Sequence, residues 1–246
     1  MLSVVLCLVS ASPAFAQNRG WINLDFISAT SNQDAQTFTL QTPVDGETAS
    51  ASASYPKMPR ATGVLVGGGF GATSLIGFGI NFDFENYEYP VGMAINIPHP
   101  LFFNRFASDV AVTSESLQRK DRGVDFEVVL SPTPSGPVSV RVFGGPTYFH
   151  VSQEMVQDIG FNQQIDLFGG NSVQITSHRD QEISGSSWGF NVGGDVGYFF
   201  TDHVGVGGEV RYNRGTVTID NEPLSGESAE LTMGHATVGG GLRLRF

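Results

Sequence analysis

Residues 189–200, GFNVGGDVGYFF, alternate strictly between large apolar side chains and a second set made almost entirely of glycine. This period of two predicts a β-strand, because successive side chains of a strand point to opposite faces. One face carries Phe190, Val192 and Tyr198, and the other carries glycines and a single carboxylate, Asp195. A strand lying on a soluble core would instead show its Lys, Thr and Glu side chains to water. The pattern favours a fold in which the large apolar face lies against an apolar environment and the glycine face lines a narrow space.

The same alternation recurs along the chain, in residues 21–27, 63–70, 75–84, 123–130, 138–145, 204–213 and 235–246. No segment after the N-terminus is apolar for long enough to span a bilayer as a helix. A spanning strand needs only about 9–11 residues, but such strands must close into a barrel that satisfies every backbone group. The sequence therefore predicts an all-β chain, a closed antiparallel barrel of about eight strands.

The connections between the expected strands differ in length. Short connections occupy residues 71–74, 131–137 and 201–203, whereas long ones cover residues 28–59, 85–120, 152–182 and 220–230. Short turns on one side and long loops on the other are typical of an up-and-down transmembrane barrel, with periplasmic turns and extracellular loops. A soluble barrel has no reason to sort its connections in this way.

The composition agrees with this fold class. The chain has 31 glycines and 19 phenylalanines, is 15% charged, and carries a net charge of -11. Many glycines and few lysines argue against a helical enzyme, and no basic patch offers contacts to the phosphates of a nucleic acid. We therefore expect no nucleic acid among the partners.

The N-terminus predicts export from the cytoplasm. An apolar run over residues 2–9 is followed by an Ala-Phe-Ala triplet ending at Ala16, which is typical of a signal peptide and its cleavage site. The expected organisation is a signal peptide at residues 1–16 and an outer-membrane β-barrel domain at residues 17–246. The only cysteine, Cys7, lies inside the signal peptide. The mature fold must therefore depend on packing and hydrogen bonds rather than on disulfides.

Two orientations of the barrel faces are compatible with the alternation. A lipocalin-like secreted barrel would turn its apolar face inward and show water a face of glycine, which neither solubilises the barrel nor protects its strands. A narrow eight-stranded lumen, by contrast, suits glycine interleaved with charges. We therefore expect a plugged lumen whose acids and bases pair, because an isolated buried charge is very costly. The predicted structural charge network consists of Asp25, Asp83, Asp125, Glu127, Asp195 and Glu209 with Arg141, Arg211, Arg243 and Arg245.

Aromatic residues support a lipid-facing outer wall. Trp188 and Tyr198 share the apolar face of one expected strand and lie ten positions apart. At ~3.3 Å per residue and a tilt near 45°, roughly 23 Å separates them along the membrane normal. This spacing matches the two aromatic girdles that flank a ~25 Å apolar band in transmembrane barrels.

The end of the chain carries a family resemblance. The final strand reads GGGLRLRF, with alternating Leu242 and Leu244 and a C-terminal Phe246. It resembles the terminal assembly signature of Gram-negative outer-membrane β-barrels. The whole mature chain resembles the small eight-stranded outer membrane protein beta-barrel domain group, related in architecture to the OmpA transmembrane domain, OmpX and OmpW. The resemblance implies residence in the outer membrane of a Gram-negative-type bacterium, with outer-membrane lipid and the barrel-assembly machinery as partners. We expect a monomer without a cofactor.

The resemblance implies little about activity, because the group contains structural, adhesive, channel and enzymatic members. We expect a non-catalytic structural or surface-interaction protein, and the alternative is a narrow, OmpW-like channel for small solutes or hydrophobic compounds. Residues 47–56, ETASASASYP, predict a hairpin extension or a mobile loop. Within residues 97–106, an apolar cluster predicts either a lid over the barrel mouth or a surface that contacts a partner. The cluster consists of Leu101, Phe102, Phe103 and Phe106.

A lipid A-modifying enzyme is a less favoured alternative. His150 and Ser152 resemble the His-x-Ser element of outer-membrane lipid A deacylases, but the following Gln153 and Glu154 do not continue that family's pattern. A serine nucleophile also needs a positioned base and an acid that orients it. The remaining histidines show no metal-ligand spacing, so we expect neither a catalytic site nor a metal site. They are His99, His178, His203 and His235.

Overall fold

The computed structural model describes residues 20–29, 35–44, 46–57, 61–132, 136–166, 168–221 and 227–246. The predicted signal peptide lies outside the described residues. Within them every regular element is a strand, and no helix is long and apolar enough to cross a membrane. The strands are β1 (Gly20–Ala29), β2 (Gln36–Val44), β3 (Glu47–Tyr55), β4 (Thr62–Gly71), β5 (Ile76–Tyr89), β6 (Gly92–Pro98), β7 (Phe106–Val112), β8 (Leu117–Leu130), β9 (Val138–Ile165), β10 (Asn171–Phe199), β11 (Val204–Asn221), β12 (Glu227–Met233) and β13 (Ala236–Arg245).

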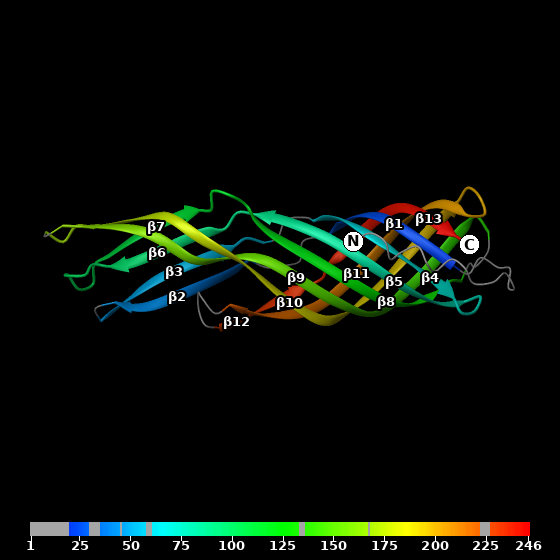
Figure 1. Cartoon of the computed structure of the whole chain (residues 1–246), viewed down its shortest axis with the longest axis horizontal. Coiled ribbons are helices and arrows are strands. Elements are labelled where there is room, and N and C mark those ends of the chain that lie inside the picture. The colour runs from blue at the N-terminus through cyan, green and yellow to red at the C-terminus, as the bar shows by residue number, and fades with distance from the viewer. Residues whose placement is uncertain are drawn as a thin grey trace.

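Eight strands form a ring of antiparallel neighbours in the order β1, β4, β5, β8, β9, β10, β11 and β13, and β13 pairs with β1 again. The Gly20 N–H donates to the Phe246 carbonyl at 2.8 Å, and the Phe246 N–H donates to the Gly20 carbonyl at 3.0 Å. β4, β8 and β10 end, and β5, β9 and β11 begin, at the end of the ring that carries the C-terminus, here called the turn end (Figure 1). The up-and-down ring of eight strands that the alternation predicts is confirmed.

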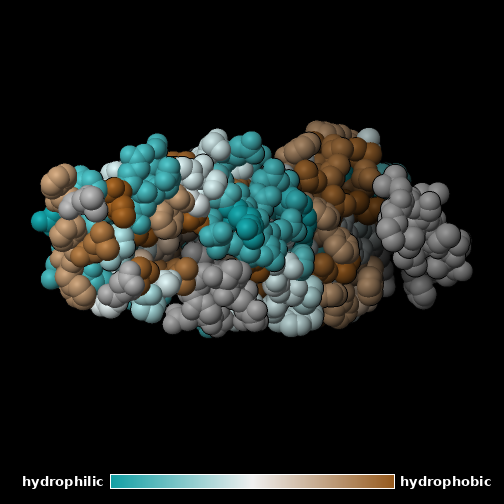
Figure 2. Space-filling model, turned by 60° about the vertical axis from the view of Figure 1, so that its left-hand side comes forward, coloured by the Kyte–Doolittle hydropathy of each residue, from teal (hydrophilic) through white to brown (hydrophobic). Residues whose placement is uncertain are grey.

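The apolar faces of the ring strands point outward. Trp188 is 62% exposed and Tyr198 is 52% exposed, whereas Asp195 between them is 3% exposed. Figure 2 shows part of the resulting belt of hydrophobic side chains on one face of the barrel, next to a hydrophilic band. A continuous exposed apolar surface of this kind marks contact with an apolar environment. The belt includes Leu24, Phe26, Val66, Phe78, Ile80, Phe82, Val128, Val142, Phe190, Val192, Val206, Val210, Val238, Leu242 and Leu244.

The long connections contain β-structure. β2, β3, β6 and β7 form a second antiparallel sheet, while β9 and β10 continue beyond the ring as one hairpin that stays paired up to Ile165 and Asn171. These strands build an extension that projects from the ring opposite the turn end (Figure 1). Residues 47–56 thus belong to a hairpin, since β3 pairs with β2. The extension has its own hydrophobic core, which includes Ala49, Ala53, Tyr55, Tyr89, Val91, Met93, Ile95, Ile97, Met155, Val156 and Ile159.

Tyr55 joins the second sheet to the long hairpin. Its Oη accepts a hydrogen bond from the Val156 N–H at 2.8 Å, and its side chain is buried. Burial raises the pKa of Tyr55 to about 12. The phenol therefore stays neutral at physiological pH and acts as a fixed hydrogen-bonding group inside the core.

We expect Tyr55→Phe to destabilise the extension by about 1–3 kcal/mol, because the buried Val156 N–H would lose its acceptor. Tyr89→Phe is the matched control, since the Tyr89 Oη makes only a long, 3.4 Å hydrogen bond to the Glu154 carbonyl. Hydrogen exchange at the Val156 amide measures the difference. Exchange should become faster in Tyr55→Phe alone, and equal rates in the two variants would contradict the assigned contact.

Candidate functional site

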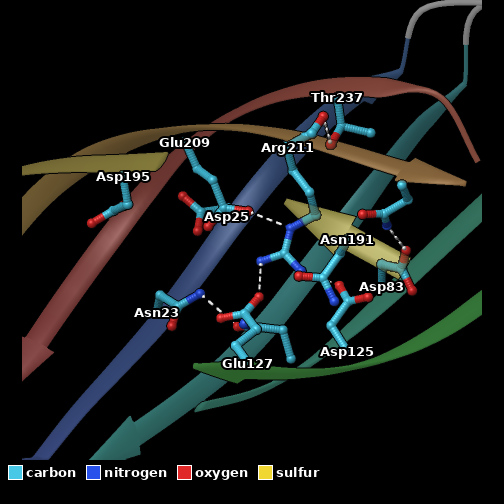
Figure 3. Close-up of polar contacts among 12 residues, drawn as sticks. Asn23, Asp25, Asp83, Asp125, Glu127, Asn191, Asp195, Glu209, Arg211 and Thr237 are labelled. Atoms are coloured by element: carbon cyan, nitrogen blue, oxygen red, sulfur yellow. Dashed lines mark hydrogen bonds and ion pairs between the residues drawn. The ribbon is translucent and has the colours of Figure 1, made fainter. Parts of the chain in front are cut away.

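A cluster of charged side chains lies in the interior of the ring. Arg211, on β11, is 2% exposed and contacts carboxylates from more than one strand. Its Nη1 pairs with Asp125, its Nη2 lies 2.8 Å from Glu127 Oε1, and its Nε donates to Glu209 Oε1 at 2.8 Å (Figure 3). The Phe143 ring covers the guanidinium at 4.7 Å. Because β8 and β11 are not neighbours in the ring, the contacts of Arg211 with Asp125 and Glu127 cross the lumen, whereas Glu209 lies on the same strand as Arg211.

Arg243, on β13, organises the second half of the cluster. Its Nη1 donates to Asp25 Oδ1 at 2.7 Å, and its Nε donates to Asp195 Oδ2 at 2.7 Å. The other oxygen of Asp195 accepts a hydrogen bond from Arg141 Nη2 at 2.6 Å. Arg141 in turn lies 5.3 Å from the centre of the Trp21 ring. Charged and aromatic side chains therefore occupy the lumen together.

The structure brings most of the predicted network residues together, namely Asp25, Asp125, Glu127, Arg141, Asp195, Glu209, Arg211 and Arg243. Arg245 does not join them. It sits at the turn end, where its Nε donates to the Asp202 carbonyl at 2.9 Å and its Nη1 donates to the Gly136 carbonyl at 2.8 Å. Asp83 lies beside the cluster, near the charges of Asp125 and Arg211 (Figure 3), and accepts a long 3.4 Å hydrogen bond from Asn213 Nδ2.

Glycines face the lumen because large side chains cross it. A Cβ atom at Gly193 would lie 2.6 Å from the Phe143 ring, and one at Gly77 would lie 3.0 Å from the Trp21 ring. A Cβ atom at Gly215 would lie 2.8 Å from the Phe149 ring. Protein interiors are packed too densely to absorb such overlaps without displacing a neighbour. These glycines therefore leave space for the large side chains that project into the lumen.

We expect Gly193→Ala to cost about 1–3 kcal/mol of unfolding free energy, because the added methyl group would overlap both the Val210 carbonyl oxygen and the Phe143 ring. Gly194→Ala is the matched control, since this glycine faces outward and a Cβ there meets only the Arg141 carbonyl at 3.5 Å. Urea unfolding of protein refolded in vesicles measures both variants. If Gly193→Ala is as stable as Gly194→Ala, neither Phe143 nor the Val210 carbonyl is packed against this position as described.

A second polar layer, which sequence reasoning missed, lies further toward the extension. Arg119 Nε pairs with Asp121 Oδ1 at 2.7 Å, and His235 Nε2 lies 3.0 Å from the Glu85 carboxylate. Burial lowers the pKa of His235, but the hydrogen bond and the charges of Glu85 and Asp121 outweigh burial and raise that pKa above its usual value. The sequence did contain a signal for this layer. The alternation of β5 continues past Asp83, so Glu85, two residues later, lies on the same inward face.

The apolar residues that predict a lid or a contact surface lie at the tip of the extension (Figure 1): Leu101, Phe102 and Phe103 in the turn between β6 and β7, and Phe106 at the start of β7. Neighbouring turns hold this turn in place, since the Asn104 N–H donates to Glu47 Oε1 at 2.6 Å and Arg105 Nη1 donates to the Gly169 carbonyl at 3.0 Å. These side chains do not cover the barrel mouth. The lid alternative does not hold, because the second sheet carries this turn away from the ring.

The residues that resemble a deacylase element do not contact each other by hydrogen bond. His150 Nδ1 lies 2.9 Å from Ser186 Oγ on β10, while the buried Ser152 Oγ has no hydrogen-bond partner among the described residues. In the part of the chain that the structure describes, no group of three or more His, Cys, Asp or Glu side chains could hold a metal ion.

A small polar cavity adjoins the charged cluster. Its lining includes Trp21, Asn81, Glu127, Arg141 and Phe143. The free space is about that of one water molecule. The cavity can hydrate the buried charges, but it is too small for an organic ligand.

Comparisons with known proteins concern the fold. No family model matches the sequence, and no curated protein matches it. The solved structure of the outer membrane protein OprG from Pseudomonas aeruginosa is similar over 94% of this chain and 96% of that chain, with a TM-score of 0.50 and 10% identity. Ail, the attachment invasion locus protein of Yersinia pestis, is 10% identical, with 92% of this chain and 99% of that chain covered and a TM-score of 0.41. The ring of eight strands and the likeness to OprG together identify the fold as that of an outer-membrane β-barrel.

Proposed function

We propose that the protein is an integral outer-membrane β-barrel of a Gram-negative-type bacterium, with a plugged lumen and no catalytic activity, whose extension acts in surface interactions. The observation that carries this proposal is a continuous apolar belt around a ring whose interior is occupied by ion pairs. A soluble barrel would need the opposite distribution of side chains.

The belt supports the placement of the barrel across the membrane. Trp188 and Tyr198, both exposed, flank its apolar residues on β10, as interfacial aromatics flank the lipid-facing band of transmembrane barrels. Because transmembrane barrels have short periplasmic turns and longer extracellular loops, the turn end would lie in the periplasm and the extension outside the cell. Export through the predicted signal peptide at residues 1–16 completes the proposed route to the outer membrane.

The tip of the extension supports a role in surface interactions. Phe168 is 94% exposed, Phe103 is 69% exposed and Leu101 is 64% exposed. Large apolar side chains that gather in this way at one end of a molecule are typical of a contact surface. The extension has a buried core of its own, so it can hold these side chains at a fixed distance from the membrane.

The proposal predicts that purified protein in planar bilayers shows no large steady conductance at neutral pH. An eight-stranded lumen is barely wide enough for its own side chains, and wide aqueous channels appear only at about 16 strands. Here Arg211, Arg243 and Trp21 already occupy that lumen. At most, small and infrequent openings are expected.

A large steady conductance would contradict the plugged lumen and favour the alternative, a narrow, OmpW-like channel for small solutes or hydrophobic compounds. A porin of known conductance, incorporated from the same detergent, is the positive control.

A further inference from the structure

Basic side chains gather on the outer wall of the ring where the belt ends. Arg122 on β8 is paired directly with His150 on β9, and Lys120 lies two residues from Arg122 on the same outward face. Directly paired side chains on one face of a sheet are about 5 Å apart at Cβ, and residues two apart along a strand are separated by about 7 Å. Lys120, Arg122 and His150 can therefore reach one ligand together.

The charges of Lys120 and Arg122 are not neutralised within the described residues. Arg122 donates its Nη hydrogens to two backbone carbonyls at 2.8 Å and to Asn86 Oδ1 at 3.0 Å, and the described structure gives neither Arg122 nor Lys120 an ion pair. Outward-facing acids begin in the next row toward the extension, at Glu88, Glu154 and Glu182. The chain carries a net charge of -11, so unpaired cations in one place favour an anionic ligand.

Exposed aromatic rings adjoin these cations on the side of the belt. Tyr148 precedes His150 by two residues on the same face, and its ring centre lies 5.3 Å from that of Trp188. The Arg122 guanidinium lies 5.5 Å from the centre of the Phe84 ring. Amphipathic rings of this kind sit at the level of lipid headgroups in transmembrane barrels. The cations are therefore at the height of headgroup phosphates.

We propose that Lys120, Arg122 and His150 bind the phosphate of an anionic lipid headgroup in the outer leaflet, whose acyl chains lie along Tyr148 and Trp188. This inference rests on the proposed function, because it requires the belt to lie in a membrane. Free phosphate would use the cations but not the exposed rings, so the lipid is the better fit. Each Lys or Arg near a membrane surface strengthens the attraction for anionic lipid about fivefold.

Trp188 provides the readout, because it lies at the site while the second tryptophan of the chain, Trp21, lies in the lumen. The full chain is refolded into phosphatidylcholine vesicles that contain either brominated phosphatidylcholine or brominated phosphatidic acid, whose bromines quench tryptophan fluorescence. We expect brominated phosphatidic acid to associate about fivefold or more strongly at Trp188. Lys120→Gln/Arg122→Gln should bring this ratio close to one. Arg179→Gln, which changes an exposed cation of the extension, should leave the ratio unchanged.

Equal quenching by the two brominated lipids in the wild type would overturn the lipid site while leaving the membrane placement intact. Absence of quenching by either lipid would instead overturn the membrane placement itself. Loss of the preference on addition of soluble glycerol phosphate would assign the site to a free phosphate and overturn the lipid assignment. If the double variant does not refold, Lys120→Gln alone is used, because this side chain is exposed. A reduced ratio in that variant supports the proposal, and an unchanged ratio contradicts it.

Discussion

Arg211→Met is expected to lower the free energy of unfolding of the barrel by about 3–5 kcal/mol, because breaking a buried ion pair leaves uncompensated charge. The substitution would leave Asp125, Glu127 and Glu209 in the lumen without the guanidinium that they share. Methionine retains an unbranched apolar stem, so most of the loss would come from charge rather than from a cavity. Urea titration of protein refolded in vesicles, followed by tryptophan fluorescence, measures the change.

Arg245→Met is the matched control for this substitution. Arg245 has the same charge, but it lies at the turn end and donates to the backbone carbonyls of Asp202 and Gly136 rather than to buried carboxylates. We expect a loss of about 1 kcal/mol or less, since these carbonyls can be solvated instead. Equal losses in the two variants would show that the lumen carboxylates do not depend on Arg211, which would contradict the proposed plug.

The barrel could be predicted from the sequence because its two environments act on alternate residues. On β10, Val192 faces outward while Gly193 packs against Phe143 inside. In the proposed membrane placement, lipid on one side favours large apolar side chains, and a narrow lumen on the other side favours glycine and the charged groups that pair there. The alternation of large apolar residues with glycine and charged residues can therefore be read from the sequence without knowing which strands pair.

The pairing inside the lumen could not be predicted in the same way. Parity shows which charges point inward, but the partners depend on the stagger between strands that are far apart in sequence. Arg211 reaches Asp125 across the lumen from a position 86 residues later in the chain. Arg245 shares the inward parity, yet the position of its side chain at the turn end leaves backbone carbonyls as its partners.

The extension was harder to predict because its strands do not have the composition of typical strands. In β3 the residues facing the core include Ala49 and Ala53, while Ser52 and Ser54 face outward. Alanine and serine have little intrinsic preference for strands, so the alternation carried a weaker signal than in the ring. The strand is stabilised by its neighbours β2 and β6 and by the core that Tyr55 joins.

The final prediction tests the membrane itself. Val192 is 48% exposed on β10, four residues after Trp188 and six before Tyr198, and therefore close to the middle of the belt. Val192→Arg is expected to lower the free energy of unfolding in vesicles by about 2–4 kcal/mol, because it places a charge near the bilayer midplane. Urea titration of protein refolded in vesicles measures this loss.

Val110→Arg is the matched control for Val192→Arg. Val110 is also an exposed strand valine, at 74%, but it lies on β7 in the extension. There the new charge meets water, so a change within about 0.5 kcal/mol is expected. If the two residues faced the same solvent, the two substitutions would cost the same. A Val192→Arg barrel that unfolds at the same urea concentration as Val110→Arg would therefore show that the belt does not face lipid.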